Sequence, residues 1–107
     1  MYTPENHNVA LVNDSGSFSV APGQVTTYVE DSITFNNLCK DDAVVIFPEE
    51  YIFGKTRIEV PAGGKATETI PADCTDFGSF PYAVYYPGRR EFAHASMPII
   101  IIYPRRD

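Results

Sequence analysis

The chain has 107 residues, of which 44% are apolar and 13% aromatic, so its length and composition fit one compact domain with its own hydrophobic core. The formal net charge of -6, from 14 acidic and 8 basic residues, disfavours nucleic acid as a partner, because phosphate binding requires a basic face. No segment reaches the roughly 18 uninterrupted apolar residues of a membrane helix, and the first residues lack the basic and apolar regions of a signal peptide, so we expect neither feature.

Beta-branched and aromatic residues dominate the sequence, and Pro and Gly interrupt it at short intervals. This pattern predicts an all-β sandwich or barrel that forms one domain over residues 1–107, with residues 1–15 as a loosely ordered N-terminal segment. One helical turn is expected around Pro48–Phe53. The predicted strands, in chain order, are Val9–Val12, Ser17–Val20, Val25–Val29, Ser32–Asn36, Ala43–Phe47, Thr56–Val60, Ala66–Ile70, Phe80–Tyr86 and Pro98–Tyr103.

Three segments carry further expectations. The glycines of Pro61–Gly64 can adopt positive φ angles, so the flanking strands Arg57–Val60 and Ala66–Ile70 are predicted to form a hairpin. Alternation along Phe80–Tyr86 directs one set of residues, with two of its tyrosines, toward the core. The run Ile99–Ile102 is apolar at every position, which predicts a central strand covered on both faces.

Paired carboxylates occur at residues 41–42 and 49–50 and could serve acid/base chemistry or bind hard cations. Nothing in the sequence places a nucleophile or a third ligand beside them, so a solvated acidic rim is the simpler interpretation. No catalytic constellation is found, and we expect no enzyme activity. His7 lies in the polar segment PENHN and is expected to be exposed.

The segment YYPGRREFAHASMPIIII, residues 85–102, places His94 three residues before Met97. Histidine and methionine are metal ligands, and the soft sulfur of methionine suits copper. The alternative is an ordinary loop in which Met97 packs at the end of the sandwich and His94 bonds locally.

Several segments together resemble the cupredoxins. VEDSITFNNLCKDDAVVIFPEE, residues 29–50, is similar to two consecutive strands of that fold and their loop, and IEVPAGGKATETI is similar to the hairpin that follows. FPYAVYY resembles the strand that delivers the copper-binding cysteine. The resemblance covers most of residues 16–103 and implies a Greek-key β-sandwich of cupredoxin type with about eight strands.

The C-terminal loop is similar to that of the CuA domain of cytochrome c oxidase subunit II, whose pattern is C-x3-C-x3-H-x2-M. The same spacing falls here on Tyr86, Arg90, His94 and Met97. The upstream histidine of the family aligns near Asp41 or Asp42. The resemblance therefore implies vestigial ligand positions at Asp42, Tyr86, Arg90, His94 and Met97, with both thiolates absent.

The loss of the thiolates removes the covalent, charge-neutralising part of such a copper site. Tyrosine is protonated near neutral pH, and Arg90 is a permanent cation that repels copper. We therefore predict a degenerate copper site in a metal-free binding or interaction module. Its binding surface would comprise Asp41, Tyr86, Arg90 and Phe92, and an ion pair of Arg90 with Asp41 or Asp42 would fill the space left by the metal.

The alternative function is a copper-binding or electron-transfer protein with an altered site built on His94 and Met97, with Cys39 as a third ligand. Cupredoxin topology places Cys39 near this loop and Cys74 at the opposite end, so no disulfide is expected between them. The cofactor is thus none or, in the alternative, copper. The resemblance further implies a periplasmic or extracellular location. The partner is expected to be an unidentified protein or small molecule. Exposed strand edges make dimerisation by sheet extension possible, so we expect a monomer or a weak dimer.

Overall fold

Eleven short strands make up most of the described chain, which comprises residues 3–50, 52–93 and 97–104 of this computed structural model. The strands are β1 (Asn6–Asp14), β2 (Ser17–Ala21), β3 (Gln24–Tyr28), β4 (Ser32–Asn37), β5 (Ala43–Ile46), β6 (Arg57–Val60), β7 (Lys65–Thr69), β8 (Gly78–Pro81), β9 (Ala83–Tyr86), β10 (Glu91–Phe92) and β11 (Ile99–Tyr103). The described residues form no helix, and hence none that could cross a membrane. The predicted all-β class is confirmed.

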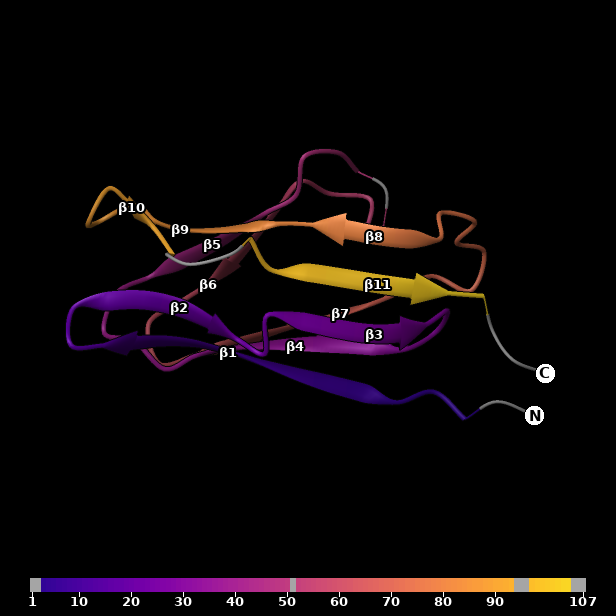
Figure 1. The fold of residues 1–107 in the computed structure, drawn as a ribbon, viewed down its shortest axis with the longest axis horizontal. Coiled ribbons are helices and arrows are strands. Elements are labelled where there is room, and N and C mark those ends of the chain that lie inside the picture. The colour runs from indigo at the N-terminus through magenta and orange to yellow at the C-terminus, as the bar shows by residue number, and fades with distance from the viewer. Residues whose placement is uncertain (1–2, 51, 94–96, 105–107) are drawn as a thin grey trace.

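The strands form three sheets that pack into a sandwich (Figure 1). One sheet has the order β2-β1-β4-β7, the second β10-β9-β5-β6, and the third β3-β11-β8. Most neighbours are antiparallel, but β1 pairs parallel with β4 and β3 pairs parallel with β11. These parallel pairs join segments far apart in sequence, because parallel neighbours need a long crossover connection.

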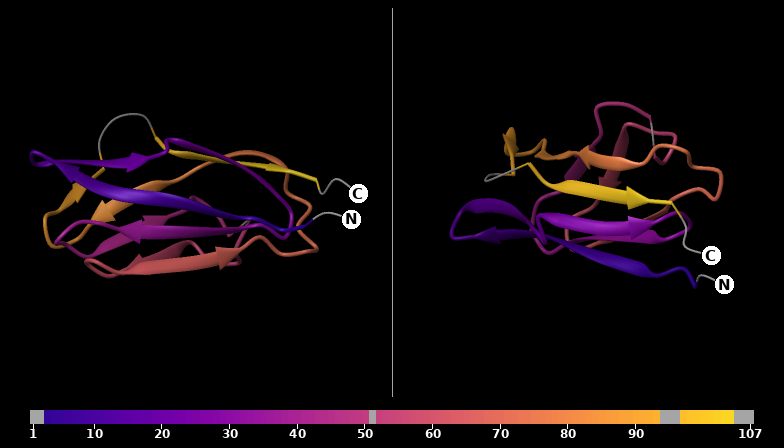
Figure 2. Two further views of the ribbon diagram at one scale, coloured as in Figure 1. Left: turned by 90° about the horizontal axis from the view of Figure 1, so that it is seen from below. Right: turned by 45° about the vertical axis from the view of Figure 1, so that its right-hand side comes forward.

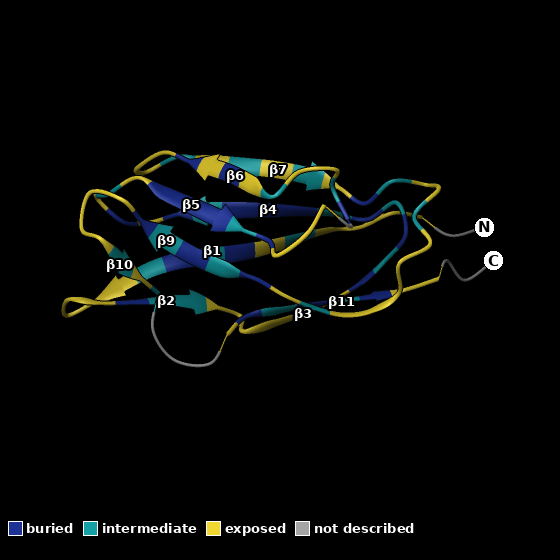
Figure 3. Cartoon of the chain, turned by 90° about the horizontal axis from the view of Figure 1, so that it is seen from above, coloured by how far each residue is buried: buried dark blue, intermediate teal, exposed yellow. Residues whose placement is uncertain are grey.

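The core lies between the layers and follows from the alternation of side chains along each strand (Figure 3). Val9 and Leu11 of β1 and Ile33 and Phe35 of β4 are fully buried. The ring of Phe35 meets that of Tyr82 edge-on at 5.8 Å between centroids. Each such side chain contributes about 1.5–3 kcal/mol through burial alone.

The sandwich has two ends, which are seen in Figure 1 and from two further sides in Figure 2. The start of β1 and the end of β11 lie at one end, here called the terminal end. The opposite end, here called the loop end, carries the β1–β2 turn and the connections at residues 38–42, 61–64 and 87–90. Cys39 and Cys74 are free thiols at the loop end and the terminal end, respectively, as the sequence predicts.

The prediction that residues 1–15 are loosely ordered is wrong for most of this segment. Residues 6–14 are not loosely ordered but form β1, which lies between β2 and β4. Its entry is fixed by Asp31, a fully buried residue whose carboxylate accepts hydrogen bonds from the backbone N–H groups of Glu5 and Tyr28. The Nε2 atom of His7 lies 2.8 Å from the same carboxylate, so His7 is a structural partner rather than a free surface residue.

The predicted hairpin of residues 57–60 and 66–70 is wrong, because β6 pairs with β5 and β7 pairs with β4 in a different sheet. The linker at Pro61–Gly64 crosses between the layers. Asp42 accepts a hydrogen bond from the N–H of Ala62 near the start of this linker, and Gly64 accepts one from the N–H of Asn37 at its end. Each end of the linker is thus bound to a different sheet.

Two further predictions need adjustment. The expected strand Phe80–Tyr86 divides into β8 and β9, because β8 pairs with β11 whereas β9 pairs with β5. The described residues of Pro48–Phe53 form bends in place of the expected helical turn. The apolar run at residues 99–102 is a central strand as predicted, although Ile99 and Ile101 are only half-buried.

Candidate functional site

Tyr86 is the last residue of β9 and occupies the interior of the loop end. Alternation along β9 turns it inward with Val84, and its side chain is 0% exposed. The ring stacks on that of Phe18 from β2, with centroids 4.0 Å apart and an interplanar angle of 26°. The prediction of a buried tyrosine face is confirmed for β9, but the prediction that Tyr86 belongs to an exposed binding surface is wrong.

Cys39 lies directly beside the Tyr86 phenol. Its Sγ is 3.6 Å from the Tyr86 hydroxyl and donates a hydrogen bond to the carbonyl oxygen of Leu11 at 3.5 Å. The N–H of Cys39 is bound by the side-chain oxygen of Asn37 at 3.0 Å. The thiol is therefore held inside the loop end, in contact with neutral groups.

Asn37 organises this part of the loop end. It belongs to the cupredoxin-like segment of residues 29–50, but sequence reasoning assigned it no role. It is fully buried, and its amide nitrogen donates to the carbonyl oxygens of Asp41 and Val60 at 2.9 and 3.0 Å. These bonds fix the loop at residues 38–42 against the end of β6. A buried Asn at the end of a strand is the available sequence signal, since such a residue must find partners in the loop that follows.

The hydroxyl of Tyr86 is kept neutral. Burial raises the pKa of this phenol well above its ordinary range, and the hydrogen bond to Cys39 and the proximity of Cys39 and Asp41 raise it further. Phenolate is the form of tyrosine that binds metals well, so this environment opposes metal binding by Tyr86 near neutral pH.

Two charged residues of the loop end lie at its rim. The Nη1 atom of Arg89 is 4.0 Å from a carboxylate oxygen of Asp41, and its guanidinium carbon lies 5.8 Å from the centroid of the Phe18 ring. The predicted pairing of Arg90 is replaced by this one among the described residues. Arg90 has a positive φ of 53° at the end of the 87–90 turn and is exposed, while Asp42 bonds Ala62.

A hollow of about 450 Å³ opens at the loop end between the β1–β2 turn and the 38–42 loop. Its lining combines apolar, acidic and basic side chains: Asn13, Leu38, Cys39, Lys40, Asp41 and Arg89. Leu38 is 68% exposed at this hollow. An exposed aliphatic side chain beside charges of both signs is a surface that suits a protein partner.

Phe92 and Met97 form a second exposed group beside β9. They are 54% and 59% exposed and line a hollow of about 240 Å³ together with Ala83, Ala93 and Pro98. The ring of Phe92 rests on that of Tyr85 at 4.7 Å. Phe92 is thus exposed as predicted for a binding surface, whereas the expectation that Met97 packs at the end of the sandwich is wrong.

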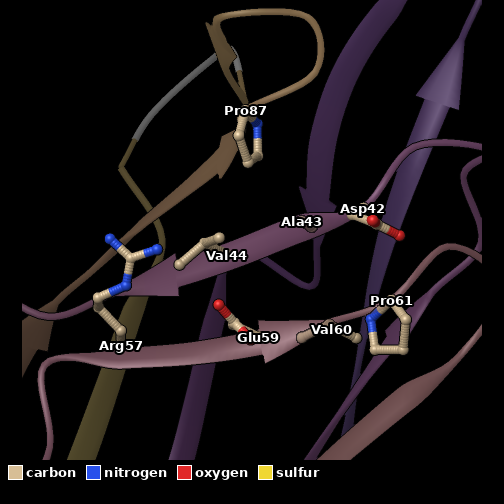
Figure 4. Close-up of a pocket in the computed structure, with 8 residues that line it drawn as sticks. All are labelled: Asp42, Ala43, Val44, Arg57, Glu59, Val60, Pro61 and Pro87. Carbon is tan, nitrogen blue, oxygen red and sulfur yellow. The ribbon is translucent and has the colours of Figure 1, made fainter.

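A third hollow, of about 440 Å³, lies on the outer face of β5 and β6 (Figure 4). Arg57 and Glu59 project from β6 at this face, Val44 lies on the neighbouring β5, and Pro61 and Pro87 lie toward the loop end. Sequence reasoning did not identify this surface. The available signal is the alternation of charged and apolar residues in RIEV.

The described residues contain no cluster of three or more His, Cys, Asp or Glu residues that could hold a metal ion. The vestigial positions Tyr86 and Arg90 offer a buried neutral phenol and a cation, and Asp42 is engaged by a backbone N–H. His94 lies outside the described residues. The donor set that is described does not fit a thiolate copper centre.

Comparison with known proteins finds solved structures with a similar fold. No family model and no curated protein matches the chain. A reduced Cu(I) form of an amicyanin variant superposes with a TM-score of 0.60 and 12% identity, covering 92% of this chain and 82% of that one. A second Cu(I) amicyanin variant gives 0.60 and 10% identity, covering 95% of this chain and 86% of that one. A multicopper oxidase from Campylobacter jejuni gives 0.58 and 10%, covering 95% of this chain and 26% of that chain.

Proposed function

We propose, from the fold and the chemistry of the loop end, that the chain is a non-enzymatic binding module whose copper site has degenerated. The fold is cupredoxin-like, as predicted, with amicyanins and a multicopper oxidase among its structural neighbours. The packing of Tyr86 carries this proposal. Its ring is stacked on Phe18, and its hydroxyl faces the Cys39 thiol at 3.6 Å. Loop spacing puts a thiolate ligand at this residue in the CuA domain, and a neutral aromatic side chain stands there instead.

The proposed binding surface is the rim of the loop end. Asp41, Arg90 and Phe92 are retained from the predicted surface, and Leu38 and Arg89 are added to it because they are exposed at or beside the hollow. The mixed charge and the exposed apolar groups favour a protein partner over nucleic acid, in keeping with the net charge of -6. A location outside the cytoplasm is proposed from the cupredoxin resemblance.

The alternative function is copper binding through an altered site. The exposed thioether of Met97 favours it, because a soft sulfur open to solvent can bind Cu(I), and His94 lies three residues away in sequence. This site would have to assemble without the two thiolates that a CuA loop carries at the positions of Tyr86 and Arg90. Cys39, whose thiol is engaged with Leu11 and Tyr86, would have to reorient in order to contribute.

Copper titration of the purified chain separates the two functions. Cu(II) is added in air and Cu(I) under reducing conditions, and bound copper is measured by absorbance and by metal analysis after gel filtration. The metal-free function predicts no stoichiometric uptake at about micromolar copper. One copper per chain, lost in His94→Ala and in Met97→Ala variants that melt like the wild type, would establish the alternative and refute the proposal. A Cys39→Ser variant measures whether the thiol contributes to any binding.

A further inference from the structure

The strand β6, Arg57–Val60, is an edge strand of the β10-β9-β5-β6 sheet. The next strand along the chain, β7, joins the other sheet, and Figure 3 shows exposed residues on both strands at the same side of the sandwich. An open edge presents unpaired backbone groups that can pair with another strand. The sequence of β6 determines which strand can pair with this edge.

The hydrogen-bond pattern identifies the backbone groups that face outward. Phe47 donates to the carbonyl oxygen of Thr56, so this pair is bonded, and pairs two residues farther along are bonded in the same way. The intervening residues Arg57 and Glu59 therefore direct their N–H and C=O groups away from β5. No backbone hydrogen bond beyond the β5–β6 ladder involves either residue within the described chain.

The backbone hydrogen bonds between β5 and β9, on the other side of β5 from β6, follow the same alternation. There, β5 pairs with β9 through Val44 and Tyr85, and Ala93 donates to the carbonyl oxygen of Val84. Bonded pairs thus alternate consistently from β10 across to β6. The outward orientation at residues 57 and 59 follows from this ladder.

The side chains at these two positions have opposite charges. Arg57 and Glu59 are both exposed on the outer face of β6, as Figure 4 shows, and neither takes part in an ion pair among the described residues. In an antiparallel pair of two β6 strands, a twofold axis at Ile58 would place each Arg57 opposite the partner's Glu59. Oppositely charged cross-strand pairs stabilise a sheet, whereas like charges directly opposite destabilise it.

This register is the one that both backbone and charge favour. Pairing must match an outward-facing residue with another outward-facing one, which confines the axis to residue 57, 58 or 59. An axis at Arg57 places two arginines opposite each other, and an axis at Glu59 places two glutamates opposite each other. The axis at Ile58 avoids both, and it allows Arg57 and Glu59 to exchange backbone hydrogen bonds across the interface.

Other edges lack this self-complementarity. The edge strands β2, β3 and β8 carry no charged residue, and β10 has two residues. On β7, Glu68 is already bound by Lys55 at 3.1 Å. From the open edge and its charge pattern, we propose that a second copy of this chain pairs with β6 through an antiparallel twofold contact centred on Ile58.

The proposed contact is short, so the dimer is expected to be weak and dependent on concentration and salt. Sedimentation of the full chain from about 10 µM to 1 mM should show a reversible monomer–dimer equilibrium. Arg57→Glu, which sets glutamates opposite each other, should weaken association by about tenfold or more. The charge-exchanged double variant, Arg57→Glu with Glu59→Arg, should restore it.

Lys40→Glu is the matched control, since it makes the same change in net charge at an exposed loop residue outside β6. It should leave the dimer unchanged. A chain that stays monomeric over the whole range would overturn the proposal, as would a dimer that survives Arg57→Glu. Failure of the double variant to restore dimerisation, with its folding intact, would likewise rule out this register. None of these results depends on copper, so the outcome is separate from that of the copper titration.

Discussion

The two ends of the sandwich bury polar side chains in different ways. At the terminal end, the carboxylate of Asp31 is fully buried and is bound by the N–H groups of Glu5 and Tyr28 and by His7. At the loop end, the described buried polar groups include the amide of Asn37, the phenol of Tyr86 and the thiol of Cys39. The charges of Asp41 and Arg89 stay at the rim.

The difference lies in the donors that each end supplies. A buried anion is tolerated only where fixed donors replace its lost hydration. Asp31 has such donors, whereas Tyr86 and Cys39 share weak contacts and are surrounded by Phe18 and other apolar groups. The terminal end therefore buries a carboxylate, whereas the described buried groups of the loop end are an amide, a phenol and a thiol.

The largest expected effect is at the loop end. Tyr86→Ala removes the ring that stacks on Phe18 and should lower the free energy of unfolding by about 3–5 kcal/mol, because the site cannot collapse fully around the cavity. Tyr86→Phe keeps the ring and should cost about 1 kcal/mol or less. Urea denaturation measures both values. The control is Tyr85→Ala on the outer face of the same strand, and an equal loss there would contradict a special role for the buried ring.

A smaller effect is expected at the terminal end. Asp31→Asn leaves an amide NH₂ group among donors, so the free energy of unfolding should fall by about 2–3 kcal/mol. Asp73→Asn, an exposed residue at the same end, should change it by about 0.5 kcal/mol or less. The same urea experiment gives both numbers. If the two variants lost equal stability, Asp31 would not be the group that fixes β1.

The sequence predicts the β-sandwich well, because alternation with period two is a local property of each strand. It fails where partners are set by distant residues. The turn at Pro61–Gly64 has the composition of a hairpin, but which strand pairs with β6 depends on β5, which lies earlier in the chain. The contact of His7 with Asp31 joins residues 24 positions apart, and a single histidine in a polar segment gives no pattern that would reveal it.

The candidate site was predicted only in part, because its local alternation can be read from the sequence whereas its contacts with distant strands cannot. Alternation correctly turned Tyr86 toward the core, but loop spacing also suggested that it lines a surface, and the two expectations conflict. In the structure Tyr86 is buried, as alternation predicts. Its ring stacks on Phe18 from β2, a partner that the local sequence does not show. The ion pair was predicted for Arg90 because the CuA-like spacing put that residue at a ligand position, but the pair forms at Arg89, one residue earlier. The positive φ of Arg90 has no signal in the sequence.

The central claim is that Tyr86 is a neutral, buried phenol where the loop spacing of a CuA domain has a thiolate, and its ionisation tests this most directly. Burial raises the pKa of Tyr86 in the folded chain above the unfolded value of about 10, so its contribution to stability is complete below that pH and is lost as pH rises beyond it. Tyrosinate absorbance can be followed in the wild type and in Tyr86→Phe, with circular dichroism reporting folding. We predict that the rise near pH 10 in the folded chain is the same in both, and that Tyr86 ionises only as the chain unfolds. A wild-type rise larger by one tyrosine in the folded state would show that Tyr86 ionises freely and would contradict the account.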